Sequence, residues 1–178
     1  MQYMTEETRI YLSDLFRDEM HNSYLYQYIS SYLSVNGLDN LSLFFKYRAR
    51  EEFRHSEMVR EFCDEKDILL DFGKPIEGFY MELNSISDFC KLAYEAEMLT
   101  NERWQRFYDM CYLDGNSRLL ITLANTFMDE QNEETEWACA LMDYYENQGE
   151  DKSAWQRFDN GFDPESYGVG IDGDDDDD

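Results

Sequence analysis

Four stretches of this chain repeat apolar residues at the three- and four-residue spacing of an amphipathic helix, and ionisable or amide side chains interrupt each stripe near its middle. The stripes are Leu12, Leu15, Glu19, Asn22, Tyr26, Ile29 and Leu33; Leu38, Leu41, Phe45, Arg48, Glu52, His55, Val59 and Phe62; Ile86, Cys90, Ala93, Glu97, Thr100, Trp104 and Phe107; and Leu120, Ala124, Phe127, Gln131, Glu134, Ala138, Leu141 and Tyr145. A buried carboxylate without a counter-charge is costly, so several at one depth indicate a shared cation. The sequence therefore predicts a dinuclear metal site inside an all-α four-helix bundle.

Two short turns allow the position of these polar residues along each helix to be counted. Val35–Asp39 contains a helix-ending glycine and an aspartate suited to cap the next helix, and Asp114–Ser117 has the same make-up. The central residue of each stripe lies a similar distance along the chain from its turn: 18 residues for Glu19 and 15 for Glu52, counted from Gly37, and 18 for Glu97 and 16 for Gln131, counted from Gly115. At about 1.5 Å of rise per residue, each lies roughly 25 Å from its turn, so the four can converge.

Glu52 and His55 form a Glu-x-x-His pair, which places both side chains on one helix face a turn apart, within reach of one ion. Carboxylates with a single imidazole are a hard ligand set that suits iron or manganese. The chain has two histidines, and only His55 lies on an inward stripe, because the fourth stretch offers the acidic and amide residues of 129–134 instead. A second metal position should therefore be poorer in nitrogen and looser.

These segments resemble those of the ferritins, and of bacterial non-haem ferritins in particular, over roughly residues 8 to 148. The matching blocks are Asp18–Gln27, Arg50–His55, Tyr94–Glu97 and Glu130–Glu134. The resemblance implies a ferritin-like four-helix bundle. It also implies a ferroxidase that oxidises Fe(II) with dioxygen or hydrogen peroxide at a di-iron centre and stores the Fe(III) as mineral.

The resemblance also implies roles for individual residues. The better-coordinated iron would be held by Glu19, Glu52 and His55. The second iron would be held by Glu52, which bridges the pair, together with Glu97 and either Gln131 or Glu134. Tyr26 matches a tyrosine that can supply an electron to the centre. A third iron position would lie beside the pair, and its matching residues are Glu51, Glu130, Glu133 and Glu134.

Several motifs that the sequence lacks bear on haem binding and on the cellular compartment of the protein. A haem site of the bacterioferritin kind would, by resemblance, require a second Glu-x-x-His, so no haem is expected. The four cysteines have no Cys-x-x-Cys spacing and are expected to be reduced core residues of a cytoplasmic protein. The first residues form neither a basic nor an apolar leader, and no run is long enough to cross a bilayer, so we expect neither export nor membrane insertion.

The charge balance is strongly acidic. Forty acidic residues against 15 basic ones give a formal net charge of −25. Nucleic acid is excluded as a partner by repulsion, since no basic patch is visible in the sequence. A field of this sign attracts cations and would concentrate Fe(II) near the protein.

A long connection separates the second and third helical stretches. Asp67–Tyr80 and a few further residues show no helical periodicity, and about eighteen extended residues span the length of a helix. This crossover makes the second and third helices parallel, as in the ferritin connection. We expect its apolar residues, including Leu69, Leu70, Phe72 and Phe79, to lie in a subunit interface.

The resemblance ends at the C-terminal segment. Ferritins with 24 subunits carry a fifth short helix that lines a symmetry axis of the cage, and no such helix is evident here beyond one or two turns around Ser153–Phe158. We expect residues 1–148 to form the bundle and residues 149–178 to be an acidic, partly disordered tail that ends in the charge block Asp174–Asp178.

Two functions fit these features. One is iron storage in a homo-oligomeric shell of 24 subunits, and the other is a soluble di-iron oxidase that forms no cage. Large stripe residues such as Phe45, Trp104 and Phe127 leave little room for an organic substrate, which favours storage. A purely structural bundle with internal ion pairs is disfavoured because the inward stripes carry no Lys or Arg apart from Arg48.

Overall fold

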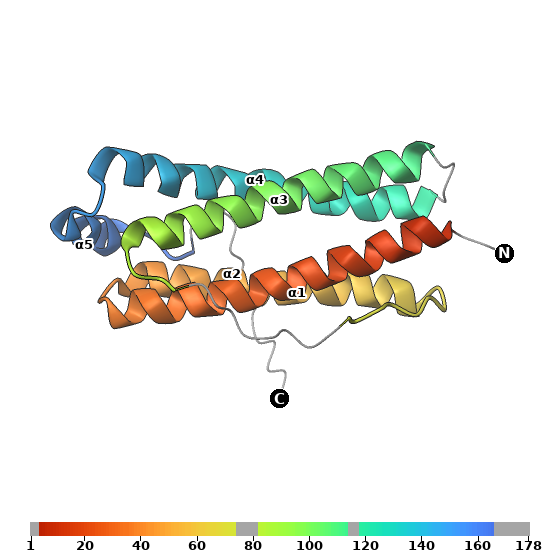
Figure 1. The fold of residues 1–178 in the computed structure, drawn as a ribbon, viewed down its shortest axis with the longest axis horizontal. Helices are drawn as coiled ribbons and strands as arrows, with labels where there is room; N and C mark the ends of the chain where they lie inside the picture. Colours follow the sequence, from red (N-terminus) through yellow and green to blue (C-terminus); the bar gives the residue numbers. More distant parts are fainter. Residues whose placement is uncertain (1–3, 74–81, 114–117, 166–178) are drawn as a thin grey trace, which may run out of the picture.

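The computed structural model describes residues 4–73, 82–113 and 118–165, and the described residues contain five helices and no strand. The helices are α1 (Glu6–Val35), α2 (Asp39–Asp64), α3 (Ile86–Leu113), α4 (Arg118–Gln148) and α5 (Lys152–Gly161). Helices α1 and α2 form one antiparallel pair and α3 and α4 form another, and the two pairs pack as layers with α1 against α3 (Figure 1). The predicted all-α four-helix bundle is confirmed.

The described ends of the connection between α2 and α3 lie at opposite ends of the bundle (Figure 1). Helix α2 ends at Asp64 at one end, and α3 begins at Ile86 at the other end, so α2 and α3 run parallel as predicted. Within the described part of this connection, Leu69 and Phe72 are exposed, with 82 % and 57 % of their surface accessible. Leu70, in contrast, is buried among the apolar residues of its own chain, so its prediction as an interface residue was wrong. Phe79 lies outside the described residues.

A fifth helix is present, although it was not evident from the sequence. The Asp151 carboxylate caps α5 by accepting hydrogen bonds from the backbone N–H of Ser153 at 2.8 Å and of Ala154 at 3.2 Å. Trp155 is fully buried and packs edge-to-face against Phe89 and Tyr144. Ten residues are too few for a helix to be stable alone, so packing of Trp155 and Phe158 on the core stabilises α5. The charge block Asp174–Asp178 lies outside the described residues.

The turn between α1 and α2 depends on α5. Gly37 has φ of +74°, a left-handed conformation that suits glycine, and it ends α1 as predicted. Asp39 was predicted to cap α2, but the cap position is Leu38, which offers no side-chain acceptor. The carboxylate of Asp159 replaces it by accepting from the backbone N–H of Leu41 at 2.8 Å and of Asn40 at 3.4 Å. The first turn of α2 is therefore capped by a residue more than one hundred positions away in the chain.

The four predicted stripes form the core, and a polar layer divides that core in two. One apolar cluster lies toward the α1–α2 turn and includes Phe44, Phe45, Phe89, Trp137 and Trp155. The other lies toward the opposite end of the bundle and includes Leu12, Val59, Trp104, Phe107 and Phe127. Of the stripe residues, Phe62 and Tyr145 are only partly buried. All four cysteines are free thiols. No helix among the described residues is long and apolar enough to cross a membrane.

Replacing Asp159 by alanine should lower the free energy of unfolding by about 1–2 kcal/mol, because two backbone N–H groups at the start of α2 lose their cap. Chemical unfolding of the metal-free protein, followed by circular dichroism at fixed protein concentration, measures this loss. Asp163→Ala is the matched control, since Asp163 is exposed and follows the same helix. Equal stabilities for the two variants would show that Asp159 does not cap α2.

Candidate metal centre

The six residues predicted to hold a metal pair converge in the polar layer at the middle of the bundle. Each of the four long helices contributes at least one of them, and none of the six is more than 4 % exposed. They are Glu19 on α1, Glu52 and His55 on α2, Glu97 on α3, and Gln131 and Glu134 on α4. The sequence predicted this convergence from the equal distances to the turns, and the structure brings the six side chains together.

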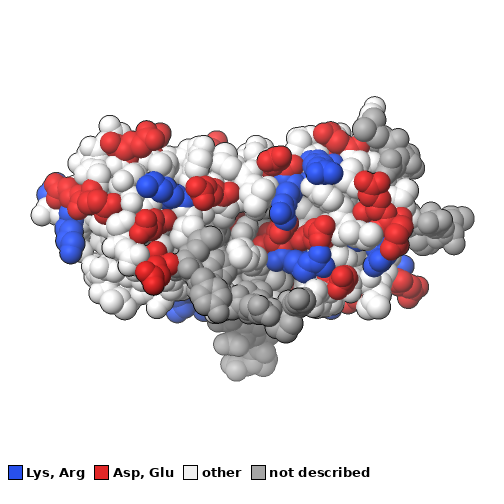
Figure 2. All heavy atoms as spheres, viewed as in Figure 1, with Lys and Arg blue, Asp and Glu red and all other residues white. Residues whose placement is uncertain are grey.

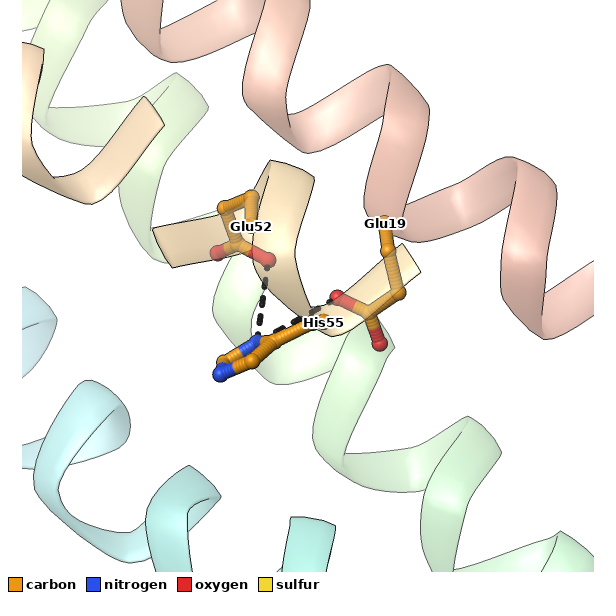
Figure 3. A group of neighbouring side chains, drawn as sticks. All are labelled: Glu19, Glu52 and His55. Atoms are coloured by element: carbon orange, nitrogen blue, oxygen red, sulfur yellow. Dashed lines mark ion pairs between the residues drawn. The ribbon is translucent and has the colours of Figure 1, made fainter. Parts of the chain in front are cut away.

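Glu19, Glu52 and His55 form the first group (Figure 3). The Nδ1 atom of His55 lies 3.8 Å from Glu19 Oε2 and 3.7 Å from Glu52 Oε2. Two ligand atoms that each lie about 2.1 Å from one ion are separated by at most about 4.2 Å. The spacing of these three side chains therefore suits one ion between α1 and α2.

Glu52, Glu97 and Glu134 form the second group, with one oxygen of each within 4.8 Å of the others. Glu52 thus takes part in both groups, as expected of a bridging carboxylate. Glu97 already has two donors, because the hydroxyl of Tyr26 donates to Oε1 and the amide of Gln131 donates to Oε2 at 2.7 Å. Of the two residues that the sequence left open, Glu134 has an oxygen in this group, and Gln131 lies beside it with its amide donating to Glu97.

Trp104 has a contact that the sequence analysis missed. Its indole N–H donates to Glu19 Oε1 at 2.7 Å, and its ring stacks on Phe127 at a centroid distance of 3.9 Å. From the sequence, Trp104 was interpreted only as one of the large residues that fill the inward stripes. Its place seven residues after Glu97 on the same stripe was the available signal, because that spacing keeps it on the inward face two turns away.

The residues predicted for a third metal position lie beside the pair. Oxygens of Glu51 and Glu134 and a ring nitrogen of His55 lie within 4.8 Å of one another. Glu130 is exposed but reaches His55, with its Oε2 atom 3.0 Å from Nε2. Glu133 is exposed and belongs to none of the three groups among the described residues.

The electrostatics of the metal-free cluster are unfavourable for most of its carboxylates. Burial and the neighbouring carboxylates raise the pKa of Glu52 and Glu134 well above the ordinary value. Burial raises the pKa of Glu97 to about 7, against the hydrogen bonds from Tyr26 and Gln131. His55 differs, because burial alone would lower its pKa but the carboxylates of Glu130, Glu19 and Glu52 raise it well above its ordinary value. A cation in place of these protons would relieve the repulsion.

The hydrogen bonding gives an independent test of whether a metal fits. Five buried carboxylate oxygens in the cluster accept no hydrogen bond: Glu19 Oε2, Glu51 Oε2, both oxygens of Glu52, and Glu134 Oε1. Buried polar atoms are nearly always paired, and a charged oxygen is the most costly exception. Four of these five atoms belong to the residues of the first and second groups, so the donor set fits two divalent ions with oxygen-rich coordination.

Comparison with known proteins agrees with this geometry. The family model of the ferritin-like domain matches residues 11–150. A protein named bacterial non-heme ferritin, from Staphylococcus epidermidis, is 25 % identical over 154 residues, which cover 83 % of this chain and 88 % of the relative. Among solved structures, an open pore ferritin from the archaeon Archaeoglobus fulgidus superposes with a TM-score of 0.81 at 22 % identity, covering 90 % of this chain and 96 % of that one. An engineered closed form of the Archaeoglobus fulgidus ferritin gives 0.79, with coverage of 88 % and 94 %. The structural likeness shows the shared fold.

Replacing Glu52 by glutamine should leave the metal-free protein at least as stable as the wild type, because burial raises the pKa of Glu52 and glutamine is neutral without having to take up a proton. Metal should then stabilise the variant less. A divalent ion at 100 times its Kd adds about 2.7 kcal/mol to a protein that binds it only when folded. Thermal unfolding with and without Zn²⁺ measures the difference, and Glu95→Gln, an exposed glutamate on α3, is the control. Equal Zn²⁺-induced shifts in wild type and Glu52→Gln would contradict the site.

Proposed function

Since the chain belongs to the family of ferritin-like domains, we propose that it is an iron-storage ferritin with ferroxidase activity. It oxidises Fe(II) with dioxygen or hydrogen peroxide at a carboxylate-bridged di-iron centre and stores the Fe(III) as mineral inside an oligomeric shell. The observation that carries the proposal is the set of buried carboxylate oxygens without hydrogen bonds, in two groups that share Glu52. The name of the Staphylococcus epidermidis relative supports the same function.

Iron is the substrate of this reaction, and the protein supplies its binding groups. Glu19, Glu52 and His55 hold the first Fe(II), and Glu52, Glu97 and Glu134 hold the second. Two Fe(II) ions each give up one electron, and one dioxygen takes up these two electrons with two protons to become hydrogen peroxide. Placing both ions on one bridging carboxylate lets the two electrons leave together, which a single ion cannot provide.

The two metal positions differ in whether their carboxylate oxygens already accept hydrogen bonds. In the first group, the indole of Trp104 holds Glu19 Oε1 and leaves Oε2 without a hydrogen bond, facing His55. In the second group, both oxygens of Glu97 accept hydrogen bonds, one from Tyr26 and one from Gln131, so an ion there shares each of these oxygens with a donor. The first Fe(II) therefore binds more tightly than the second, in line with the looser second position predicted from the sequence.

Tyr26 has the position of a redox partner. Its ring is fully buried, and its hydroxyl donates to Glu97, a residue of the second group. Burial and the charge of Glu97 raise its pKa well above the ordinary value, so the phenol stays protonated at neutral pH. Losing an electron from such a phenol requires that its proton moves as well, and Glu97 is the acceptor already in contact with that proton.

Packing around the centre favours storage over oxidation of an organic substrate. Trp104 and Phe127 stack on one side of the cluster, and His55 packs edge-to-face on Phe127. Three cavities lined by described residues lie elsewhere on the protein, and none of these three is lined by a residue of the two metal groups. A di-iron oxidase outside a cage would need such a cavity beside its metals.

Assembly into a shell of about 24 copies completes the proposal. The exposed Leu69 and Phe72 on the crossover are apolar surface that a subunit contact would cover. The net charge of −25 per chain opposes assembly, but Figure 2 shows acidic and basic groups interspersed on one face, so local pairing between copies is available. Cations in the medium reduce the remaining repulsion.

Replacing His55 by alanine, or Glu52 by alanine, should slow the initial oxidation of Fe(II) by at least about 100-fold, since loss of groups that only support a metal ligand already costs 10–100-fold. Stopped-flow absorbance of Fe(III) under air measures the initial rate. His21→Ala is the matched control, because His21 is the other histidine and lies exposed on α1. A wild-type initial rate in His55→Ala would reject the assigned centre.

Light scattering should give the mass of a shell of about 24 subunits at roughly 0.15 M salt. Assembly should be less complete in low salt, where the Debye length rises from about 8 Å toward 30 Å and charges on neighbouring copies repel over a longer range. Leu69→Lys/Phe72→Lys should shift the protein toward smaller species if these residues lie between subunits. A mass of one or two subunits for the wild type at 0.15 M salt would remove the cage from the proposal and favour a soluble di-iron oxidase.

A further inference from the structure

Arg48 lies in the polar layer, one helical turn before Glu52 on α2. It is 1 % exposed, and it is the only lysine or arginine among the buried residues that the structure describes. Its Nη1 atom lies 2.9 Å from Glu51 Oε2 and 4.0 Å from Glu134 Oε1. Burying an arginine is costly unless its charge is compensated, and these two carboxylates supply compensating charge.

Two aromatic rings hold the guanidinium in position. Its central carbon lies 5.4 Å from the ring centroid of Phe44 and 5.9 Å from that of Trp137. Both rings are buried and belong to the apolar cluster toward the α1–α2 turn. An arginine keeps its proton under all conditions that leave a protein folded, so this is a fixed positive charge.

The guanidinium of Arg48 lies beside the residues that the sequence predicted to hold a third iron. The third group of metal-ligand atoms is made by Glu51, His55 and Glu134. Arg48 contacts two of these three residues, Glu51 and Glu134, through a single nitrogen. A divalent ion at this position would lie next to the guanidinium and share both carboxylates with it.

The charge of the cluster leads to the same conclusion. Its buried or mostly buried carboxylates are Glu19, Glu51, Glu52, Glu97 and Glu134. With His55 neutral, as metal binding requires, these five carry five negative charges when ionised, and Arg48 neutralises one. The remaining four match two divalent ions. A third ion would leave an excess of two positive charges in a buried site, against an excess of one in a variant that lacks Arg48.

We propose that Arg48 takes the place of a third metal ion and limits the centre to two ions per chain. This inference rests on the proposed function, since it concerns the same centre. Glu51 then serves as the counter-ion of Arg48. Glu130 contacts His55 Nε2, the nitrogen opposite the one that faces the first group, and so fixes the orientation of the ring.

The test is the number of ions bound tightly, measured without any redox step. Isothermal titration of the metal-free wild-type protein with Zn²⁺ at roughly 0.15 M salt should give two tight sites per chain, and visible absorption of bound Co²⁺ should saturate at the same ratio. Arg48→Gln removes the charge and should bind three. Arg48→Met, which keeps an apolar stem of similar length against Phe44 and Trp137, should also bind three and covers the case in which the glutamine variant does not fold.

Four further variants separate the effect of charge from that of packing and set the background. Arg48→Lys keeps a positive charge and should bind two ions. Arg48→Gln/Glu51→Gln lacks both the guanidinium and its carboxylate partner, so it should return to two. Glu51→Gln alone should also keep two, since Glu51 holds Arg48 and no metal. Glu52→Gln defines the background from exposed carboxylates, because it disrupts both tight positions.

The outcomes separate this inference from the proposed function. Two ions in the wild type and three in Arg48→Gln or Arg48→Met support the role of Arg48. Three ions in the wild type, or two in both Arg48→Gln and Arg48→Met, overturn it and leave the di-iron centre in place. Fewer than two tight ions in the wild type overturn this inference together with the proposed function.

Discussion

The structure depends on an excess of negative charge at the middle of its core. Five glutamates and a histidine from four helices meet in one layer, and a single arginine faces them. Two apolar clusters on either side of this layer provide the burial that keeps the helices together. A buried acidic cluster without ligand is one of the most costly features a core can carry. Under the proposed function, cations neutralise this layer, and metal binding then stabilises the fold.

Hydrogen-bond donors arrange this cluster without neutralising it. Trp104 and Gln131 each hold one oxygen of a carboxylate, on Glu19 and Glu97 respectively, and Tyr26 holds the other oxygen of Glu97. None of the three carries a charge at neutral pH. They orient the glutamates while the negative charge stays available for metal. Arg48 differs because its charge competes directly with a bound ion, which is why it bears on the number of ions and the neutral donors do not.

The sequence by itself determined the bundle, the position of the centre and the residues that meet there. Helical periodicity fixed which side chains face inward, and the interruptions Glu19, Glu52, His55, Glu97 and Glu134 stood on those faces. Counting from Gly37 and Gly115 fixed their depth. This works because a long straight helix has a constant rise and a constant angle per residue, so both the face and the height of a residue follow from its number. The long gap before Ile86 fixed the parallel course of α2 and α3 in the same way.

Only the tertiary structure decided the features that depend on contacts between segments far apart in the chain. Asp159 of α5 caps α2 in place of Asp39, and Trp155 anchors α5 in the core. Glu134 and Gln131 lie on the same stripe but have different partners, since Glu134 has an oxygen in the second group and the amide of Gln131 donates to Glu97. Periodicity places a residue on a face but leaves its side-chain direction open. That direction is set by partners from other helices, and the free energy of those contacts does not appear in any local pattern.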